Sequence, residues 1–304
     1  GVVNVHLDRM ASDPSNTGEG LAPLLPIREL VRAAWSELLF GIPFDDPAYA
    51  EVCEIVDDLD VYRFDPISND QANRRLDRLS VMIRERVGPD ADGSGVGAPA
   101  EFERLHPGSL DDPGTIRNLI YTMCTARDDV AGLLMWVLKH LTDHPDWAAA
   151  VRTAPDRDVV DRVVSETLRL RQSEFLFRRA RRQLAVDGST IPKDWIVRVC
   201  THEIHRDPEK FPDPDRFDPD RFADGGCGRE TYAPFGIDHH SCVGEPLTRE
   251  FAAVFATELL QRFELHPMDD GPIELSARRH WAPSSRFRVE LRVLAEVVAP
   301  DTGR

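Results

Sequence analysis

The sequence predicts a mainly α-helical protein with small β-sheets. Apolar residues recur at helical spacing through several long stretches, of which residues 112–142 form the longest. Alternating apolar residues occur only in short segments of the second half of the chain. Hydrophobic residues make up 41% of the 304 positions, which is enough for one large core. We therefore expect residues 1–304 to form a single domain.

The first half of the chain is predicted to consist of helices separated by turn signals. Residues 1–20 are polar and show little pattern. Gly41, with Pro43 soon after it, ends the first predicted helix, as glycine just beyond a helix often does. The expected helices cover residues 21–40, 47–59, 69–87 and 111–141, with loops at 60–68 and at the Gly- and Asp-rich 89–97.

The long helix over about 112–142 is apolar on most sides and is expected to run through the protein interior. Asp112 is a suitable N-cap, and Pro113 suits the first helical position. Residues 124–130 interrupt the apolar pattern with three adjacent charges. Buried charges are unfavourable unless they are paired or used in function. A solvated bulge, a paired cluster and a functional site all remain open.

In the second half, short helices are followed by strands. The Asp187–Gly188 pair predicts a tight hairpin turn. Residues 211–222 hold three prolines and predict an ordered stretch that is neither helix nor sheet. The expected helices cover 147–152, 156–170 and 245–263, and the expected strands cover 175–178, 182–186, 195–200, 273–275 and 287–293.

The composition excludes several classes of protein. The formal net charge is −16, which disfavours sequence-independent binding of nucleic acid. No run of 18 apolar residues is present, so we expect no membrane span, and the first residues do not resemble a secretion signal. Five scattered cysteines without a CxxC motif favour a reducing compartment, and we expect a cytoplasmic protein.

Cys242 stands at the start of the predicted helix 245–263, in the stretch 233–244. Amide groups at a helix N-terminus favour a thiolate, the form of cysteine that binds metals. Gly236 and Gly244 permit backbone approaches that a β-carbon would block. The alternative is a buried structural cysteine, which is the more common role of a lone cysteine.

Glu166 and Arg169 lie three residues apart on a predicted helix, so their side chains share one face. Taken alone, such a pair is usually a surface salt bridge that contributes little stability.

The order of these features resembles the cytochrome P450 family of heme-thiolate enzymes. The long central helix, Glu-x-x-Arg, the β turn, the Pro-Asp-Arg-Phe stretch and the Phe-Gly…His-x-Cys-x-Gly loop succeed one another over residues 21–292. The resemblance implies a cytochrome P450 fold lacking its N-terminal helices, because members usually carry about a hundred more residues there.

The resemblance implies heme b, iron protoporphyrin IX, as the cofactor. Cys242 would be its axial thiolate ligand, and His240 would reach a heme propionate. Phe235 would pack beside the loop, while Gly236 and Gly244 would allow the loop to approach the heme closely.

Three further positions match the family. Arg178 occupies the place of its propionate-binding arginine, and bidentate arginine suits a carboxylate. Glu166 and Arg169 would form a buried pair that ties their helix to the stretch 211–222, where Arg216 or Arg221 is expected to join.

The chain departs from the family pattern at two sites. Asp238 stands where the family has glycine, which brings bulk and charge near the heme and bears on loop geometry and redox potential. Asp128 falls at the family's acid position and Asp129 at its threonine, with Ala126 or Arg127 at the adjacent glycine. An aspartate can shuttle a proton but does not copy a hydroxyl's hydrogen bonds.

The resemblance implies an oxidase or monooxygenase that acts on a small organic, natural-product-like substrate. A ferredoxin-type partner would supply electrons near Arg229 and Arg249, which are equally explained as solvated charges. Candidate substrate contacts are Met123, Ala126, Phe175 and Trp281, any of which would also suit a protein core.

Two alternatives remain. In the first, the chain is a peroxide-using heme-thiolate enzyme with Asp128 or Asp129 as acid–base. In the second, it is a catalytically silent relative that serves as a partner or scaffold in a biosynthetic pathway. Asp129, Asp238 and the short N-terminus favour the silent relative, whereas Cys242, His240 and Arg178 oppose it.

Overall fold

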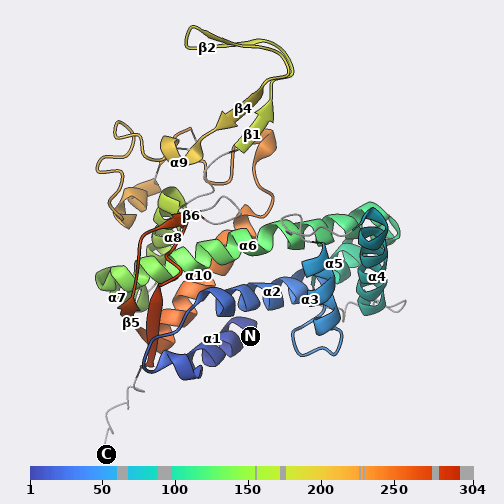
Figure 1. The fold of residues 1–304 in the computed structure, drawn as a ribbon, viewed down its shortest axis with the longest axis horizontal. Coiled ribbons are helices and arrows are strands. Elements are labelled where there is room, and N and C mark those ends of the chain that lie inside the picture. The colour runs from blue at the N-terminus through green and yellow to red at the C-terminus, as the bar shows by residue number, and fades with distance from the viewer. Residues whose placement is uncertain are drawn as a thin grey trace, which may run out of the picture. The chain divides into compact units, whose positions relative to one another are not determined.

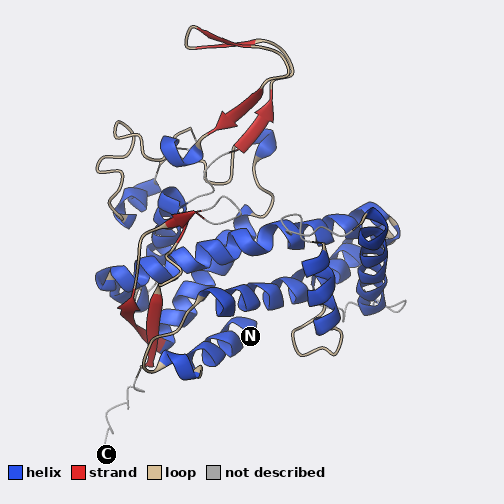
Figure 2. Cartoon of the chain, in the orientation of Figure 1, coloured by secondary structure: helices blue, strands red, loops and turns tan. Residues whose placement is uncertain are grey.

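The computed structural model is mainly helical with small sheets, as the sequence predicts (Figure 2). It describes residues 1–59, 68–87, 97–154, 156–171, 176–225, 227–228, 230–275 and 281–294. Two compact units are found, residues 1–12 with 22–131 and residues 13–21 with 132–304. The single-domain assignment stays a prediction. Within the described ranges, no helix is both long and apolar enough to cross a membrane.

Among its described residues, the first unit contains helices and no strand (Figure 1). It includes the start of α6, which runs over Pro113–Asp143 and begins where the Asp112 side chain accepts a hydrogen bond from the Gly114 N–H at 2.9 Å. The other helices of this unit are α1 (Val2–Ala11), α2 (Leu24–Phe40), α3 (Tyr49–Asp58), α4 (Asn69–Val87), α5 (Gly97–Leu105) and the 3₁₀ segment η2 (Ser109–Asp111).

The absence of pattern expected for residues 1–20 is wrong, because α1 forms there. Val3, Leu7 and Met10 recur at helical spacing and are buried. Helix α2 ends as expected at Gly41, which takes a left-handed conformation with φ 68°. Helix α5 was not predicted; the loop expected at 89–97 lies outside the described residues except for Gly97, as does most of the loop at 60–68.

The second unit combines three α-helices of nine residues or more with short strands. Its longer helices, besides the end of α6, are α7 (Pro145–Thr153), α8 (Asp158–Arg171) and α10 (Glu245–Arg262). The short helices are α9 (Thr201–Ile204), which was not predicted, and the 3₁₀ segments η1 (Pro14–Asn16), η3 (Pro219–Gly225) and η4 (Asp238–His240).

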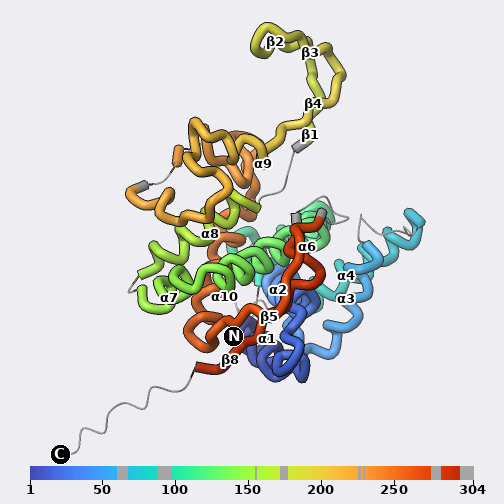
Figure 3. The backbone as a smooth tube through the Cα atoms, turned by 60° about the vertical axis from the view of Figure 1, so that its left-hand side comes forward, coloured from blue at the N-terminus to red at the C-terminus, as the bar shows by residue number. Residues whose placement is uncertain are grey.

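The strands pair in antiparallel twos among the described residues. Strands β1 (Leu176–Arg179) and β4 (Ile196–Val199) form one pair, and the hairpin of β2 (Leu184–Val186) and β3 (Ser189–Ile191) projects beyond it in both views (Figures 1 and 3). Asp187 and Gly188 form its turn with φ 46° and 76°, as their sequence predicts. The other pairs are β5 (Phe263–Asp269) with β8 (Arg288–Val293) and β6 (Glu274–Leu275) with β7 (Trp281–Ala282).

An N-terminal segment completes the β5–β8 sheet. The buried Asn16 side chain donates to the Leu291 carbonyl at 2.9 Å and accepts from the Leu291 N–H at 2.8 Å. Leu21 adds a β-bridge to Val289. Residues 13–21 therefore belong with the second unit rather than with the helices on either side of them.

Candidate functional site

The loop 233–244 folds back on itself before α10. The Cys242 N–H donates to the Phe235 carbonyl at 2.8 Å, and the Gly236 N–H donates to the Ala233 carbonyl at 3.1 Å. Gly236 has φ +78°, and a β-carbon there would stand 2.9 Å from the His240 carbonyl oxygen. Both facts require glycine at this position. The loop's shape is thus set by backbone bonds and one glycine.

Asp238 also adopts a left-handed conformation, with φ 52°. Glycine takes this conformation freely, and aspartate is among the residues that tolerate it at a penalty of about 1–2 kcal/mol. The Asp238 carbonyl accepts the Ser241 N–H at 3.1 Å, and the side chain is exposed. The aspartate therefore keeps a backbone conformation that glycine would adopt without strain.

The thiol of Cys242 is exposed at the start of α10. Gly244 is the N-cap, and the Glu245 N–H donates to the Cys242 carbonyl at 3.3 Å. A β-carbon on Gly244 would lie 3.7 Å from the Cys242 Sγ, which is ordinary contact. Cys242 is thus not a buried structural cysteine within the second unit, and its sulfur is available to a ligand.

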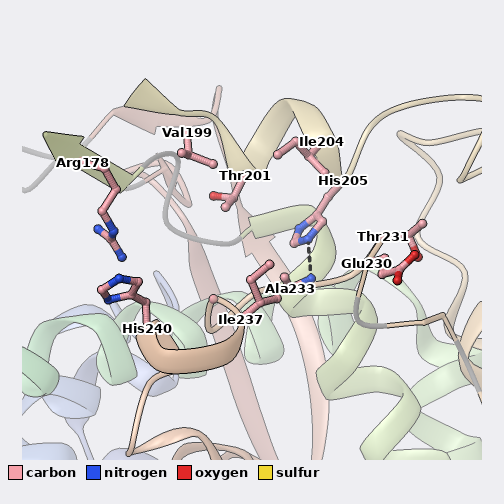
Figure 4. A pocket seen from close by; sticks show the side chains of 11 residues that line it. Arg178, Val199, Thr201, Ile204, His205, Glu230, Thr231, Ala233, Ile237 and His240 are labelled. Atoms are coloured by element: carbon pink, nitrogen blue, oxygen red, sulfur yellow. Dashed lines mark hydrogen bonds between the residues drawn. The ribbon is translucent and has the colours of Figure 1, made fainter. Parts of the chain in front are cut away.

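A cavity of about 270 Å³ adjoins this loop within the second unit. Val199, Ile204 and Ile237 give it apolar walls. Arg178, from β1, and His240, from the loop, point towards one another across it (Figure 4). An apolar space lined by an arginine and a histidine, both hydrogen-bond donors, suits a flat apolar group that carries carboxylates.

The Glu166–Arg169 pair of α8 is fully buried, with 0% of either side chain exposed. Arg169 Nε and Nη2 donate to the two carboxylate oxygens of Glu166 at 2.7 and 2.9 Å, in a bidentate arrangement. The spacing of the two residues predicts the pairing, the family resemblance implies its burial, and the structure has both.

The buried pair also holds the segment 205–221. Glu166 accepts the Asp218 N–H at 2.9 Å, and Arg169 Nη2 donates to the Arg216 carbonyl at 3.3 Å. The Arg221 Nε lies 3.4 Å from a Glu166 oxygen. Of the two expected partners, Arg221 contributes its side chain and Arg216 its carbonyl.

His205 is a site residue that sequence reasoning missed. It is 1% exposed, its carbonyl accepts from Arg169 Nη1 at 2.7 Å, and its Nε2 accepts from the Ala233 N–H at 3.1 Å. Burial lowers the pKa of the imidazole to about 4, and the positive charge of Arg169 adds to the effect, with smaller contributions from Arg206 and His202. Its position just before Arg206-Asp-Pro was the available signal.

Arg249, a candidate contact for a redox partner, is half-buried and bound within the unit. Its Nε donates to Glu245 at 2.9 Å and its Nη1 to the Ser165 hydroxyl at 3.2 Å. Its guanidinium lies 5.3 Å from the centre of the Phe235 ring, and 5.8 Å from that of Tyr232. These contacts give Arg249 a role in fastening α10 to the loop. Arg229 lies outside the described residues.

The charges inside α6 form a paired cluster in the first unit. Arg127, 8% exposed, bonds to Asp57 at 2.8 Å and to Asp128 at 3.3 Å. Arg28 lies 3.4 Å from Asp128. Asp129 is exposed. The helix continues through this segment without a bulge, so pairing rather than solvation accounts for the charges.

The remaining predicted contacts are placed only in part. Met123 is fully buried and Ala126 half-buried on α6. Phe175 and the side chain of Trp281 lie outside the described residues. These four stay predicted substrate contacts.

Comparison with known families decides the assignment. The sequence model of the family described as Cytochrome P450 matches residues 106–290, more than half of the chain. The chain belongs to the cytochrome P450 family.

Several curated P450 proteins are similar to this chain. Abscisic acid 8'-hydroxylase CYP707A1 of Solanum lycopersicum is 30% identical over 207 residues, which are 58% of this chain and 43% of that protein. Abscisic acid 8'-hydroxylase 3 of Oryza sativa subsp. japonica is 32% identical over 203 residues, 59% and 40% of the two chains. This P450 chain spans about two fifths of the length of these relatives.

A solved P450 structure shares the fold. The retinoic acid-bound cyanobacterial CYP120A1 superposes with a TM-score of 0.76 at 22% identity, over 96% of this chain and 73% of the other. The P450 family implies heme, and the donor set of the second unit fits that group: an exposed thiol at a helix start, an apolar cavity, and Arg178 facing His240.

Proposed function

We propose that this chain binds heme b through the Cys242 thiolate and acts as a cytochrome P450-type monooxygenase or oxidase. The observation that carries the proposal is the loop closed by the Cys242–Phe235 bond, which leaves the sulfur exposed at the start of α10. When bound, heme supplies oxygen activation, and a thiolate ligand favours O–O cleavage by donating electron density to iron.

The protein's own residues bind and orient the group. Arg178 and His240 are proposed to bind its two carboxylates, since both reach the same cavity. Gly236 and Gly244 are proposed to let the loop backbone lie close to the heme. Phe235 packs against the Arg249 guanidinium.

The proposed substrate is a small organic, natural-product-like molecule. The curated relatives support this class, because they include abscisic acid 8'-hydroxylases. Met123, Ala126, Phe175 and Trp281 are the proposed substrate contacts. A ferredoxin-type protein is the proposed electron donor, and a cytoplasmic location stays a prediction.

A peroxide-using enzyme is the second candidate. Asp129 is exposed on α6, whereas the side chain of Asp128 is only 10% exposed, so Asp129 is the more accessible candidate for moving a proton. Asp129→Ala is then expected to lower peroxide-supported turnover more than substrate binding. Omitting the redox partner from the assay separates the two mechanisms.

The spectrum of the reduced carbon monoxide complex tests the proposal. After reconstitution with heme, the wild-type chain is expected to show the band typical of thiolate-ligated heme. Cys242→Ser removes that band, while Cys53→Ser, which alters a half-buried cysteine of the first unit, keeps it. A fully folded wild-type chain without the band would refute heme-thiolate ligation and favour the silent-scaffold alternative.

A further inference from the structure

His205 follows the short helix α9 and accepts two hydrogen bonds from outside that helix. Its backbone carbonyl accepts from Arg169 of the buried ion pair at 2.7 Å. Its side-chain Nε2 accepts from the Ala233 N–H, the first amide of the cysteine loop, at 3.1 Å (Figure 4). One residue thus joins the pair on α8 to the start of the loop.

The direction of the second bond fixes the state of the ring. A backbone N–H only donates, so Nε2 carries no hydrogen and the neutral imidazole has its proton on Nδ1. Within the described part of the chain, Nδ1 is buried without a hydrogen-bond partner. The hydrogen bond from the Ala233 N–H is therefore the polar contact that the His205 ring makes in this part of the chain.

The ring is also fixed in place by its neighbours. Its centroid lies 5.4 Å from that of Tyr232, which precedes Ala233, and 6.2 Å from that of Phe211. The Tyr232 hydroxyl in turn donates to the Ser165 carbonyl of α8 at 2.9 Å. Displacement of the His205 ring would break its contacts with both aromatic rings.

The consequence reaches the cysteine through the backbone. The Ala233 carbonyl accepts the Gly236 N–H. The carbonyl of Phe235, the residue directly before Gly236, accepts the Cys242 N–H. An unanchored Ala233 would loosen this chain of bonds. A buried amide that loses its acceptor is also destabilising in itself.

We propose that His205 is a positioning residue that fixes the cysteine loop relative to the buried Glu166–Arg169 pair by accepting the Ala233 N–H. The proposal rests on the proposed function in one respect, that the loop carries the heme ligand. It predicts a role for the acceptor atom at the Nε2 position, and not for the size or polarity of the side chain alone.

Substitutions at His205 separate these possibilities. His205→Gln places an amide oxygen near the Nε2 position and keeps an acceptor. His205→Phe keeps an aromatic ring without an acceptor, and His205→Asn is polar but too short to reach. His202→Phe, on the preceding helix, is the matched control because it leaves the Ala233 acceptor in place.

Hydrogen exchange of the full chain, purified without heme, measures the effect. Peptides covering residues 231–241 are expected to exchange about tenfold faster in His205→Phe and His205→Asn, the size of one lost hydrogen bond. His205→Gln and His202→Phe are expected to stay near wild type, and peptides from β5 and β8 to stay unchanged.

Unchanged exchange at 231–241 in His205→Phe, or equal acceleration in His205→Gln, would overturn the proposal. If His205→Phe does not fold, the comparison of His205→Gln with His205→Asn decides. Because the measurement needs no heme, failure of heme binding refutes the proposed function without affecting this result. In a heme-binding chain, the thiolate-type band should shift or fall in His205→Asn and recover in His205→Gln.

Discussion

Replacing Glu166 with alanine is expected to destabilise the chain by about 3–5 kcal/mol, the usual effect of leaving one buried charge without its partner. Both members of the Glu166–Arg169 pair are 0% exposed, so water cannot replace the lost carboxylate. The variant loses two bonds to Arg169 and the acceptor of the Asp218 N–H. Glu166→Gln keeps an acceptor and should lose less.

An exposed pair at the start of the same helix provides the control, with Arg157 directly before α8 and Asp161 in its first turn. Arg157 and Asp161 lie 3.0 Å apart with 43% and 51% of their side chains exposed, and Asp161→Asn should alter stability by only about 0–0.5 kcal/mol. Thermal unfolding followed by circular dichroism measures both. At about 2–4 °C per kcal/mol, Glu166→Ala should lower Tm by roughly 6–20 °C. A fall no larger than that of Asp161→Asn would refute the assigned role of burial.

Other predictions concern the loop and its anchor. Gly236→Ala should destabilise the chain by more than the ~1–2 kcal/mol of a left-handed alanine, because its β-carbon meets the His240 carbonyl. Gly188→Ala is the control, because Gly188 has φ +76° and open space around it, so this variant measures the backbone cost alone. Equal Tm shifts in the two variants would contradict the contact with the His240 carbonyl. Asp238→Gly should stabilise by about 1 kcal/mol, and a lower Tm would contradict the strain inferred from φ 52°. The pKa of His205 is lowered from 6.5 to about 4, so the folded chain binds fewer protons than the unfolded chain between these two pH values. About 3 kcal/mol of stability that is present above pH 6.5 is therefore lost as the pH falls towards 4. In His205→Gln the measured slope of Tm against pH should flatten, and an unchanged slope would count against the assignment.

The longer elements were readable from the sequence because periodicity over many residues determines them. Helices α2, α3, α4, α8 and α10 begin and end within three residues of their predicted bounds. Helix α1 was missed because its stripe of Val3, Leu7 and Met10 is short and set among polar residues. Helix α9 is a single turn, too short for any period to appear.

The site was readable in its residue types but not in its environment. The spacing of Glu166 and Arg169 is the same on an exposed helix face as in a core, so only the family resemblance implied their burial. In the structure, residues 205–221, which are distant in sequence, contact the pair. Likewise, Asp238 is visible as a departure from the family pattern, but its left-handed φ depends on the bonds that close the loop. His205 was missed because one histidine carries no periodic signal.

The paired amide of Asn16 has a consequence for the order in which the chain assembles. Its partner Leu291 lies 275 residues later, and both backbone groups of Leu291 depend on the same side chain. On the ribosome, residues 13–21 emerge early and remain hydrated until β8 has been synthesised. The β5–β8 sheet of the second unit therefore cannot be completed until β8 has left the ribosome.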